Sequence, residues 1–229
     1  MTEQHRSPLW VRWVAEAVII VASVFVAVLL EGLAEDSSRS AAAHTSLAQL
    51  AEELRADRED LAEVRLRQEE LSVVYDDLLR WLAVPGTIPG DSVQSALDRV
   101  AFLNRTMYPR RGAWSAMTST GQLVWVDDQI LASRLAKMYE STHSKLEYMG
   151  QDYDFNVNEF SRLSIPQAWD SQREQPRVNG PADVIELRGQ LRYLRLSWNN
   201  YYLDLLDDYG SEMDELLRDL HDYLLDDDT

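Results

Sequence analysis

The stretch SLAQLAEELRADREDLAEVRLRQEELSVVYDDLLRWL, residues 46–82, decides the fold of this chain. Its apolar residues recur at intervals of three and four, which places them on one face of an α-helix. These residues are Leu47, Leu50, Leu54, Leu61, Val64, Leu71, Tyr75, Leu78 and Leu82. Asp57 and Gln68 fall where the heptad repeat expects apolar side chains, which weakens a strict coiled coil. The pattern therefore predicts a long amphipathic helix of about ten turns.

Further helices are predicted on the C-terminal side of this stretch. They cover residues 91–104, 113–119 and 127–148, and a last long helix follows Pro181, with a kink allowed near Gly210. Leu123, Val124 and Val126 are interpreted as packing beneath the 127–148 helix, with a short strand as the alternative. Residues 151–175 are polar and interrupted by proline, so we expect an irregular excursion with at most one helix. The two long helices are expected to pair antiparallel in an all-α bundle, with the shorter helices between them.

On the N-terminal side lies AVIIVASVFVAVLL, residues 17–30, a run without charges. As a helix it rises only about 21 Å, less than the roughly 30 Å of a bilayer core. With its flanks it predicts a transmembrane helix over residues 9–34, preceded by a short segment, residues 1–8. Trp10 and Trp13 are interpreted as interfacial anchors, and Arg12 with Glu16 as a pair on one helix face. Contact with a neighbouring helix is expected at Glu16 and at three small residues, Ala22, Ser23 and Ala27.

The basic residues around this run predict its orientation. Arg6 and Arg12 precede it, whereas Arg39 is the only lysine or arginine in the twenty residues after it. The positive-inside rule then predicts a bacterial inner-membrane protein with a cytoplasmic N-terminus and a periplasmic domain over residues 35–225, ending in an acidic tail, 226–229. A cleaved signal peptide is the alternative, because Gly32-Leu33-Ala34 resembles a small-x-small cleavage site.

The composition restricts the classes of partner and of chemistry. The 229 residues carry a formal net charge of −17, so nucleic acid and anionic lipid surfaces are repelled. The chain has no cysteine, which excludes disulfides, thiolate nucleophiles and cysteine-ligated metals. After removal of a membrane anchor, its length fits one domain of ordinary size.

No motif in the sequence indicates catalysis, a cofactor or a metal. The four histidines, His5, His44, His143 and His221, are scattered and lack metal-ligand spacing. Residues 152–158 begin like a calcium loop, but Val157 replaces the required glycine and Leu163 the required glutamate, so a solvated polar loop is expected. The sequence therefore predicts no catalytic, cofactor-binding or metal-binding residues, and a protein that is not an enzyme.

The C-terminal stretch is strongly acidic. Residues 203–229 contain eleven acidic residues and one basic residue, Arg218. This stretch is interpreted either as a solvated helix face, or as a docking strip for a basic partner or a loose binding site for divalent cations. The candidate contact residues are Asp207, Asp208, Glu212, Asp214 and Glu215, together with Tyr202, which we expect to be exposed.

Two stretches resemble a family of uncharacterised bacterial proteins that have one N-terminal span and a helical extramembrane domain. The first begins Ala15-Glu16-Ala17 and runs to Glu35, departing from the family pattern over residues 31–34. The second is WSAMTSTGQL, residues 114–123, continuing through Val126, Asp128, Leu131, Leu135 and Tyr139. The resemblance implies a membrane-anchored helical protein and brings no catalytic or binding residues.

Taken together, these features predict a membrane-anchored, non-enzymatic accessory or scaffolding subunit of a larger bacterial membrane assembly, for example a respiratory or photosynthetic complex. Its expected partners are the lipid bilayer and other membrane-protein subunits, or a second copy of the chain, contacted through the span and the long helices. The alternative is a sensor or small-ligand-binding module tethered to the inner membrane.

Overall fold

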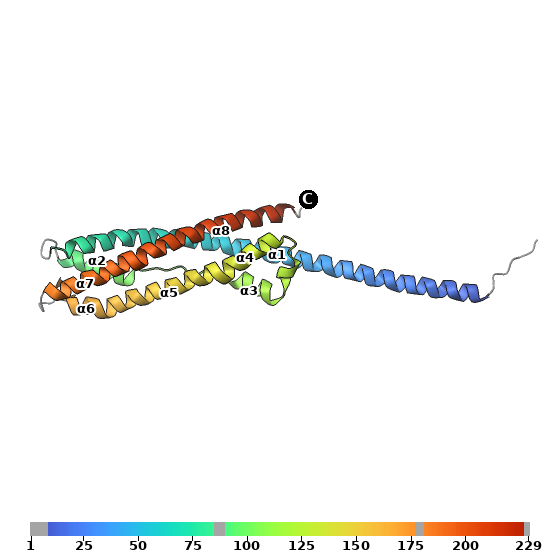
Figure 1. Cartoon of the computed structure of the whole chain (residues 1–229), viewed down its shortest axis with the longest axis horizontal. Coiled ribbons are helices and arrows are strands. Elements are labelled where there is room, and N and C mark those ends of the chain that lie inside the picture. Colours follow the sequence, from blue (N-terminus) through green and yellow to red (C-terminus); the bar gives the residue numbers. More distant parts are fainter. Residues whose placement is uncertain (1–8, 85–89, 177–180, 227–229) are drawn as a thin grey trace, which may run out of the picture.

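The computed structural model describes residues 9–84, 90–176 and 181–226, and among these it leaves out the side chains of residues 9–20, 22, 32–33, 176, 181–183 and 226. The described residues form an all-α bundle from which one long helix projects (Figure 1). The predicted segment 1–8 and most of the predicted tail, residues 227–229, lie outside this description.

The projecting helix, α1, runs without interruption from Leu9 to Trp81, a length of 73 residues. At 1.5 Å per residue it is about 110 Å long. From Ala43 onward its apolar face is buried in the bundle, whereas the described side chains between residues 21 and 41 are exposed. We call the part of α1 before residue 42 the stalk. The predicted span and the predicted first bundle helix are thus one continuous element.

Two further helical rods complete the bundle. One consists of α4 (Gln129–Lys137), η2 (Met138–Thr142), α5 (His143–Glu159), η3 (Phe160–Ser164) and α6 (Ile165–Ala168). The other consists of α7 (Pro181–Tyr193), η4 (Leu194–Asn199) and α8 (Asn200–Asp226). The elements η2, η3 and η4 are short π-helical turns within these rods. The all-α class is confirmed, but the middle rod is much longer than the helix predicted over residues 127–148.

The last rod runs antiparallel to α1, as the sequence predicts. Arg58 of α1 pairs with Asp214, Arg65 pairs with Asp207, and Asp76 pairs with Arg195. The partner number falls as the α1 number rises, which defines the antiparallel direction. Gly210 does not interrupt α8. Its lack of a side chain lets Leu61 of α1 approach, since an added Cβ would lie 3.0 Å from Leu61 Cδ2.

Short elements cover the two ends of the bundle. At the end far from the stalk, α2 (Gly90–Phe102) packs on α1, and β1 (Trp169–Asp170) pairs antiparallel with β2 (Gln175–Pro176). Near the stalk, α3 (Gly112–Ser119) and the 3₁₀ helix η1 (Gln122–Trp125) pack on α1 (Figure 1). A non-helical segment, residues 103–111, joins α2 to α3 along the bundle.

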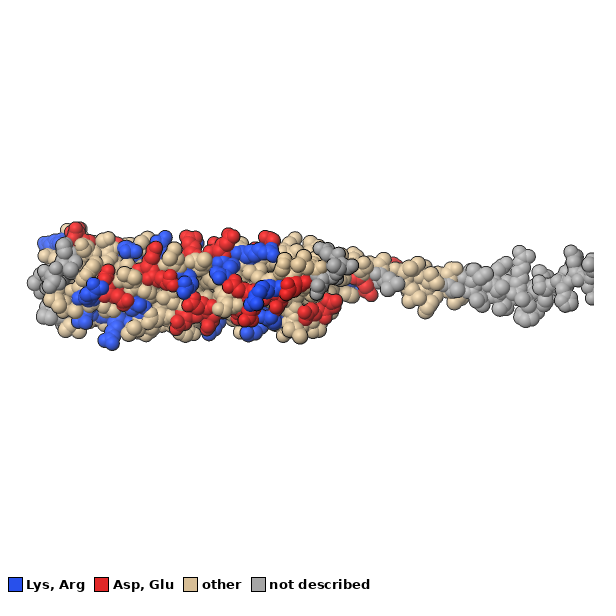
Figure 2. Space-filling view, turned by 90° about the horizontal axis from the view of Figure 1, so that it is seen from above, with Lys and Arg blue, Asp and Glu red and all other residues tan. Residues whose placement is uncertain are grey.

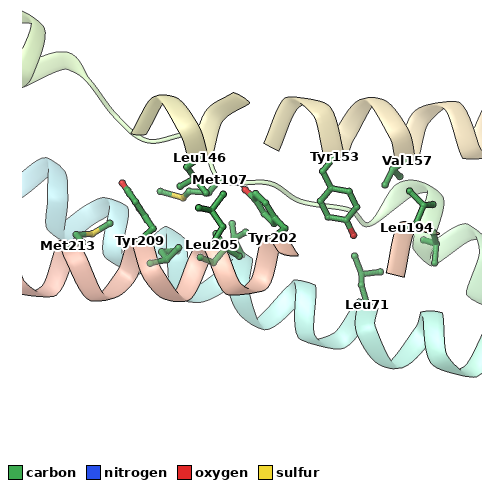
Figure 3. Close-up of a cluster of buried hydrophobic side chains, with 14 of the residues drawn as sticks. Leu71, Met107, Leu146, Tyr153, Val157, Leu194, Tyr202, Leu205, Tyr209 and Met213 are labelled. Atoms are coloured by element: carbon green, nitrogen blue, oxygen red, sulfur yellow. Dashed lines mark hydrogen bonds between the residues drawn. The ribbon is translucent and has the colours of Figure 1, made fainter. Parts of the chain in front are cut away.

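Aromatic and aliphatic side chains from all three rods fill the core. Figure 3 shows Tyr202, Leu205 and Tyr209 of α8 pointing inward, toward Leu146 of α5 and Met107 of the non-helical segment. All five of these side chains are buried. Tyr153 of α5 lies further along the same interior and faces α1.

Two local predictions are wrong. Residues 151–168 are helical, because Tyr153, Val157 and Phe160 keep a buried face at helical spacing within a mostly polar sequence. Residues 152–158 therefore form part of α5 and are not a solvated loop. Residues 122–125 form η1, so the alternative of a short strand there is wrong. Leu123 packs against the core and Val126 is fully buried, as expected, whereas Val124 is exposed.

Candidate functional site

The most polar part of the interior surrounds the non-helical segment 103–111. Asp57, which interrupts the apolar face of α1, is buried and accepts hydrogen bonds from the Arg110 backbone N–H (2.9 Å) and side chain (2.6 Å). The same guanidinium reaches Asp60 at 2.8 Å. Burial raises the pKa of Asp57, while the hydrogen bonds and charge of Arg110 oppose that shift. One end of the segment is therefore held to α1 by an ion pair between the buried Asp57 carboxylate and the exposed Arg110 guanidinium.

Gln68, the second polar interruption in α1, holds the other end of the segment. Its amide nitrogen donates to Asn104 Oδ1 at 2.9 Å and to the Arg105 carbonyl at 2.6 Å. Its carbonyl oxygen accepts from Asn199 of η4 at 3.0 Å and from the Tyr153 hydroxyl at 3.3 Å. Gln68 thus connects the segment to both other rods, which explains a buried amide inside an otherwise apolar face.

Asp154 of α5 holds the segment from the opposite side. Its two carboxylate oxygens accept hydrogen bonds from Asn104 (2.7 Å), Thr106 (2.7 Å) and Tyr108 (2.8 Å). The hydroxyl of Tyr202 accepts from the Met107 backbone N–H at 2.7 Å. This stretch of chain, which lies outside any helix or strand, is therefore held by side chains of all three rods. The arrangement is structural, since it orders the connection between α2 and α3.

A histidine and two tyrosines form a second buried polar cluster, in the half of the bundle nearer the stalk. His143 Nε2 lies 2.9 Å from the Tyr209 hydroxyl, and its ring meets Tyr139 edge to face with centroids 4.3 Å apart. Trp114 stacks on the other side of Tyr139 at 5.0 Å. Burial, together with the nearby charge of Arg111, lowers the pKa of His143 to about 3, so the imidazole is neutral at pH 7. Neutral and enclosed, this histidine fits a packing role.

The predicted docking residues on α8 are mostly engaged within the protein. Four of the five acidic residues form ion pairs: Asp207 with Arg65, Glu212 with Lys137, Asp214 with Arg58, and Glu215 with Arg134. Asp208 is exposed and has no partner among the described residues. Figure 2 shows basic side chains interspersed with acidic ones over the face of the bundle in view. The strip is therefore partly neutralised, and its role as a docking surface stays a prediction.

The expectation that Tyr202 is exposed is wrong. Tyr202 is 1% exposed, because it lies on the face of α8 that packs against the non-helical segment, where its hydroxyl accepts a hydrogen bond from the Met107 backbone N–H.

Between α1 and α8 the surface is hollowed into a groove of about 530 Å³. Its floor includes Leu61, Leu206 and Gly210, and the Arg58–Asp214 and Arg65–Asp207 pairs line it.

The stalk carries a continuous run of uncovered apolar side chains. Seven large apolar residues between Val21 and Leu30 are 53–69% exposed: Val21, Val24, Phe25, Val26, Val28, Leu29 and Leu30. Successive helix residues differ by about 100° in direction, so these side chains cover about two thirds of the helix circumference, and Ala27, which is also apolar, lies in the remaining sector. Ser23 and Ala27, two of the predicted helix-contact residues, are exposed among them. The side chains of Trp10, Arg12, Trp13, Glu16 and Ala22 lie outside the description.

Within the described part of the chain, no helix carries an apolar stretch long enough to cross a membrane. Of the predicted span over residues 9–34, the first described side chain is that of Val21. Among the side chains that the structure includes, no group of three or more histidine, aspartate or glutamate residues is arranged to hold a metal ion.

Fold and surface together define the class: an all-α bundle protein with a long projecting helix that is apolar on all sides over residues 21–30. Residues 16–168 match the family of unknown function DUF6090. This match covers more than half of the 229 residues, so the chain belongs to that family. Membership in an uncharacterised family is thereby confirmed. Neither the curated proteins nor the solved structures include a match to this chain.

The matched range stops at the end of the middle rod. It includes α1 from Glu16, the short elements and the rod that ends with α6, whereas α7, η4 and α8 lie beyond it. It contains the second stretch of the resemblance, residues 114–139, and the first from Glu16 onward. Gln68 and Met107 fall within the matched range, whereas Asn199, which donates to Gln68, and Tyr202, which accepts from Met107, do not.

Proposed function

We propose that this protein is a membrane-anchored, non-enzymatic accessory or scaffolding subunit that makes protein contacts within a larger bacterial membrane assembly, such as a respiratory or photosynthetic complex. The N-terminal part of α1 is the anchor, and the bundle is the interaction domain. The partners are other membrane-protein subunits, or a second copy of the chain, reached through the span and the long helices.

One observation carries the anchor: the apolar side chains of residues 21–30 surround the stalk and are uncovered. A helix that is apolar on all sides requires an apolar environment on all sides. A single partner helix or a surface groove covers only one side, whereas the acyl chains of a bilayer cover every side. The lipid bilayer therefore fits this surface better than one protein partner does.

The bundle is suited to protein contacts by its attachment. Because α1 is uninterrupted from Leu9 to Trp81, the bundle is held at a fixed distance and direction from the anchor. The positions of Arg6 and Arg12 before the apolar run support a cytoplasmic N-terminus, an inner-membrane location and a periplasmic bundle.

Membrane fractionation of the full chain tests the anchor. Replacing Val24 and Val28 together by arginine places two charges in the apolar run, each costing about 2.5–3.5 kcal/mol at the centre of a span. We expect this variant to leave the membrane fraction. Arginines at Leu66 and Val73, which are equally exposed on the bundle, are the matched control and leave the distribution unchanged. A wild-type chain found in the soluble fraction would contradict the proposal.

Co-purification in mild detergent tests the role as a subunit. We expect the full chain to elute with stoichiometric partners, or as a defined oligomer. Glu16→Ala removes the predicted carboxylate contact within the span and is expected to weaken this association. Elution of the wild-type chain as a lone monomer contradicts the subunit role. An unchanged complex in Glu16→Ala would show that Glu16 makes no contact with a partner and that the span serves only to attach the bundle to the membrane.

A further inference from the structure

Apolar side chains also remain uncovered at the end of the bundle from which the stalk leaves. Val124 of η1 is 80% exposed, Ile130 at the start of α4 is 75% exposed, and Leu225 near the end of α8 is 54% exposed. Their elements meet at this end of the bundle (Figure 1). The hydroxyl of Tyr223 donates to Asp127 at 2.7 Å, which ties the end of α8 to the turn after η1.

Two contacts with α1 define how far η1 reaches toward the stalk. Gln122, at the start of η1, accepts a hydrogen bond from Ser46. The ring of Trp125, at its end, lies 5.0 Å from the guanidinium carbon of Arg39. Ser46 and Arg39 are seven residues apart in α1, which corresponds to about 10 Å along the helix axis. From Gln122 to Trp125, η1 therefore runs along α1 toward the stalk. Trp125 contacts the exposed part of α1, beyond Ala43, where the buried face of α1 begins.

This advance brings η1 close to the predicted end of the span. Arg39 is five residues beyond Ala34, which is about 7.5 Å along the helix. The headgroup layer on each side of a bilayer is roughly 5–7 Å thick. Trp125 therefore lies near the outer boundary of that layer when residues 9–34 span the membrane. A modest tilt of the stalk toward the side of η1 brings η1 closer to the membrane.

The side chains at this position suit a lipid interface. Tryptophan is enriched at headgroup depth because one edge of its ring is polar and the rest apolar. Three nearby acidic residues have partners: Glu35 pairs with Arg39, Asp127 binds Tyr223, and Asp128 caps α4 through the Ile130 and Leu131 backbone N–H groups. Asp36 and Asp222 are exposed and stay hydrated. The negative charge of the chain favours zwitterionic over anionic lipid.

We propose that η1 is a second membrane contact: Val124 and Trp125, with Ile130 and Leu225 beside them, rest in the headgroup layer of the bilayer that holds the anchor. The inference rests on the proposed function, because the distance of η1 from the membrane is measured from the end of the predicted span. Two contacts, one through α1 and one through η1, fix the tilt of the bundle relative to the membrane.

Depth-dependent quenching tests this contact. The chain has no cysteine, so a single fluorophore can be attached to the Val28→Cys, Val124→Cys or Ile185→Cys variant. Each full-length variant is reconstituted in phosphatidylcholine vesicles that contain lipids with a nitroxide on the headgroup or on the acyl chain. We expect acyl-chain nitroxides to quench the label at residue 28, headgroup nitroxides to quench the label at residue 124, and neither to quench the label at residue 185, which lies on α7 at the far end.

The outcomes separate the two proposals. Quenching at residue 28 with none at residue 124 overturns the contact through η1 and keeps the anchor. Absence of quenching at residue 28 overturns the anchor itself. An Ile130→Cys label offers a second measurement: adding Val124→Glu is expected to reduce its headgroup quenching, whereas Val124→Leu preserves it. Equal quenching in these two variants would overturn the role of Val124.

Discussion

Asp57 and Gln68 interrupt the apolar face of α1, yet both are buried. Each occupies a position that the heptad repeat assigns to the core, and each has its hydrogen-bond partners in the non-helical segment. A buried polar group without a partner costs about 1–3 kcal/mol, so these residues are tolerated only because the segment lies against them. Conversely, the segment lies outside any helix or strand and depends on the side chains of Asp57 and Gln68 for its hydrogen bonds to α1.

Replacing Asp57 by leucine is expected to destabilise the protein although it completes the apolar repeat. The change leaves the Arg110 backbone N–H without its acceptor and removes the ion pair. We expect the free energy of unfolding to fall by about 2–4 kcal/mol. Urea denaturation measures this difference, and Glu59→Gln, at an exposed neighbouring position, is the control with no change. Equal or greater stability of Asp57→Leu would show that the segment does not need this contact.

The buried imidazole of His143 makes stability depend on pH. Its pKa is about 3 in the folded protein against 6.5 in the unfolded chain, so the unfolded state takes up a proton first as the pH falls. Stability is therefore full above pH 6.5 and is lost as the pH falls below it. Between pH 6.5 and 5, where most carboxylates stay ionised, the expected slope approaches about 1.4 kcal/mol per pH unit.

His143→Phe keeps an aromatic ring and removes this titration. Its free energy of unfolding, measured by urea denaturation between pH 5 and 6.5, is expected to vary less with pH than that of the wild type. His221→Gln, at an exposed position, is the control and keeps the wild-type slope. Identical slopes in the wild type and His143→Phe would contradict the assignment.

At the scale of elements, the packing of α1 against α8 depends on a close approach at Gly210. A Cβ there would lie 3.0 Å from Leu61 Cδ2, whereas a Cβ at Gly189 of α7 meets no atom within 4 Å. The two glycines therefore differ in what a side chain would cost. At Gly189 only the backbone freedom of glycine matters, and it disfavours the helix.

Gly210→Val is expected to lower the free energy of unfolding by about 1–3 kcal/mol, because the added atoms overlap Leu61. Gly189→Ala is the matched control and is expected to raise stability by up to about 1 kcal/mol through helix propensity. Adding Leu61→Ala to Gly210→Val should cost less than the sum of the two single changes. Additive effects in this double-mutant cycle would show that the two side chains do not compete for one space.

At the scale of the whole molecule, the continuity of α1 joins the stalk to the bundle. The described side chains of residues 34–41 are exposed and lie outside the buried core, so the direction of the stalk depends on the helix itself. Proline in a helix interior removes one hydrogen bond and bends the helix, at a cost of about 3 kcal/mol or more. A bend at this place changes the direction of the stalk and leaves the packed bundle intact.

Ser38→Pro is expected to change the direction of the stalk without changing the stability of the bundle. Spin labels attached at residues 28 and 66 lie 38 residues apart along α1, which corresponds to about 57 Å in a straight helix. We expect a narrow distance distribution near that value in the wild type and a shorter, broader one in Ser38→Pro, with an unchanged denaturation midpoint of the bundle. Ser38→Ala is the control. A narrow distribution in the proline variant would contradict the dependence on helix continuity.

Helical periodicity alone determined the all-α class, the long helix over residues 46–82 and the last long helix, because the spacing of apolar residues is a local property of the chain. The antiparallel pairing of these two helices is an expectation that contacts such as Arg58 with Asp214 confirm. The tertiary structure decided which polar residues are buried. Asp57 meets Arg110 across 53 residues, and Tyr202 meets Met107 across 95. It also decided that residues 151–168 are helical, since their few apolar side chains form a face only when the other rods cover it. Such contacts depend on the arrangement of distant segments, which no local pattern contains.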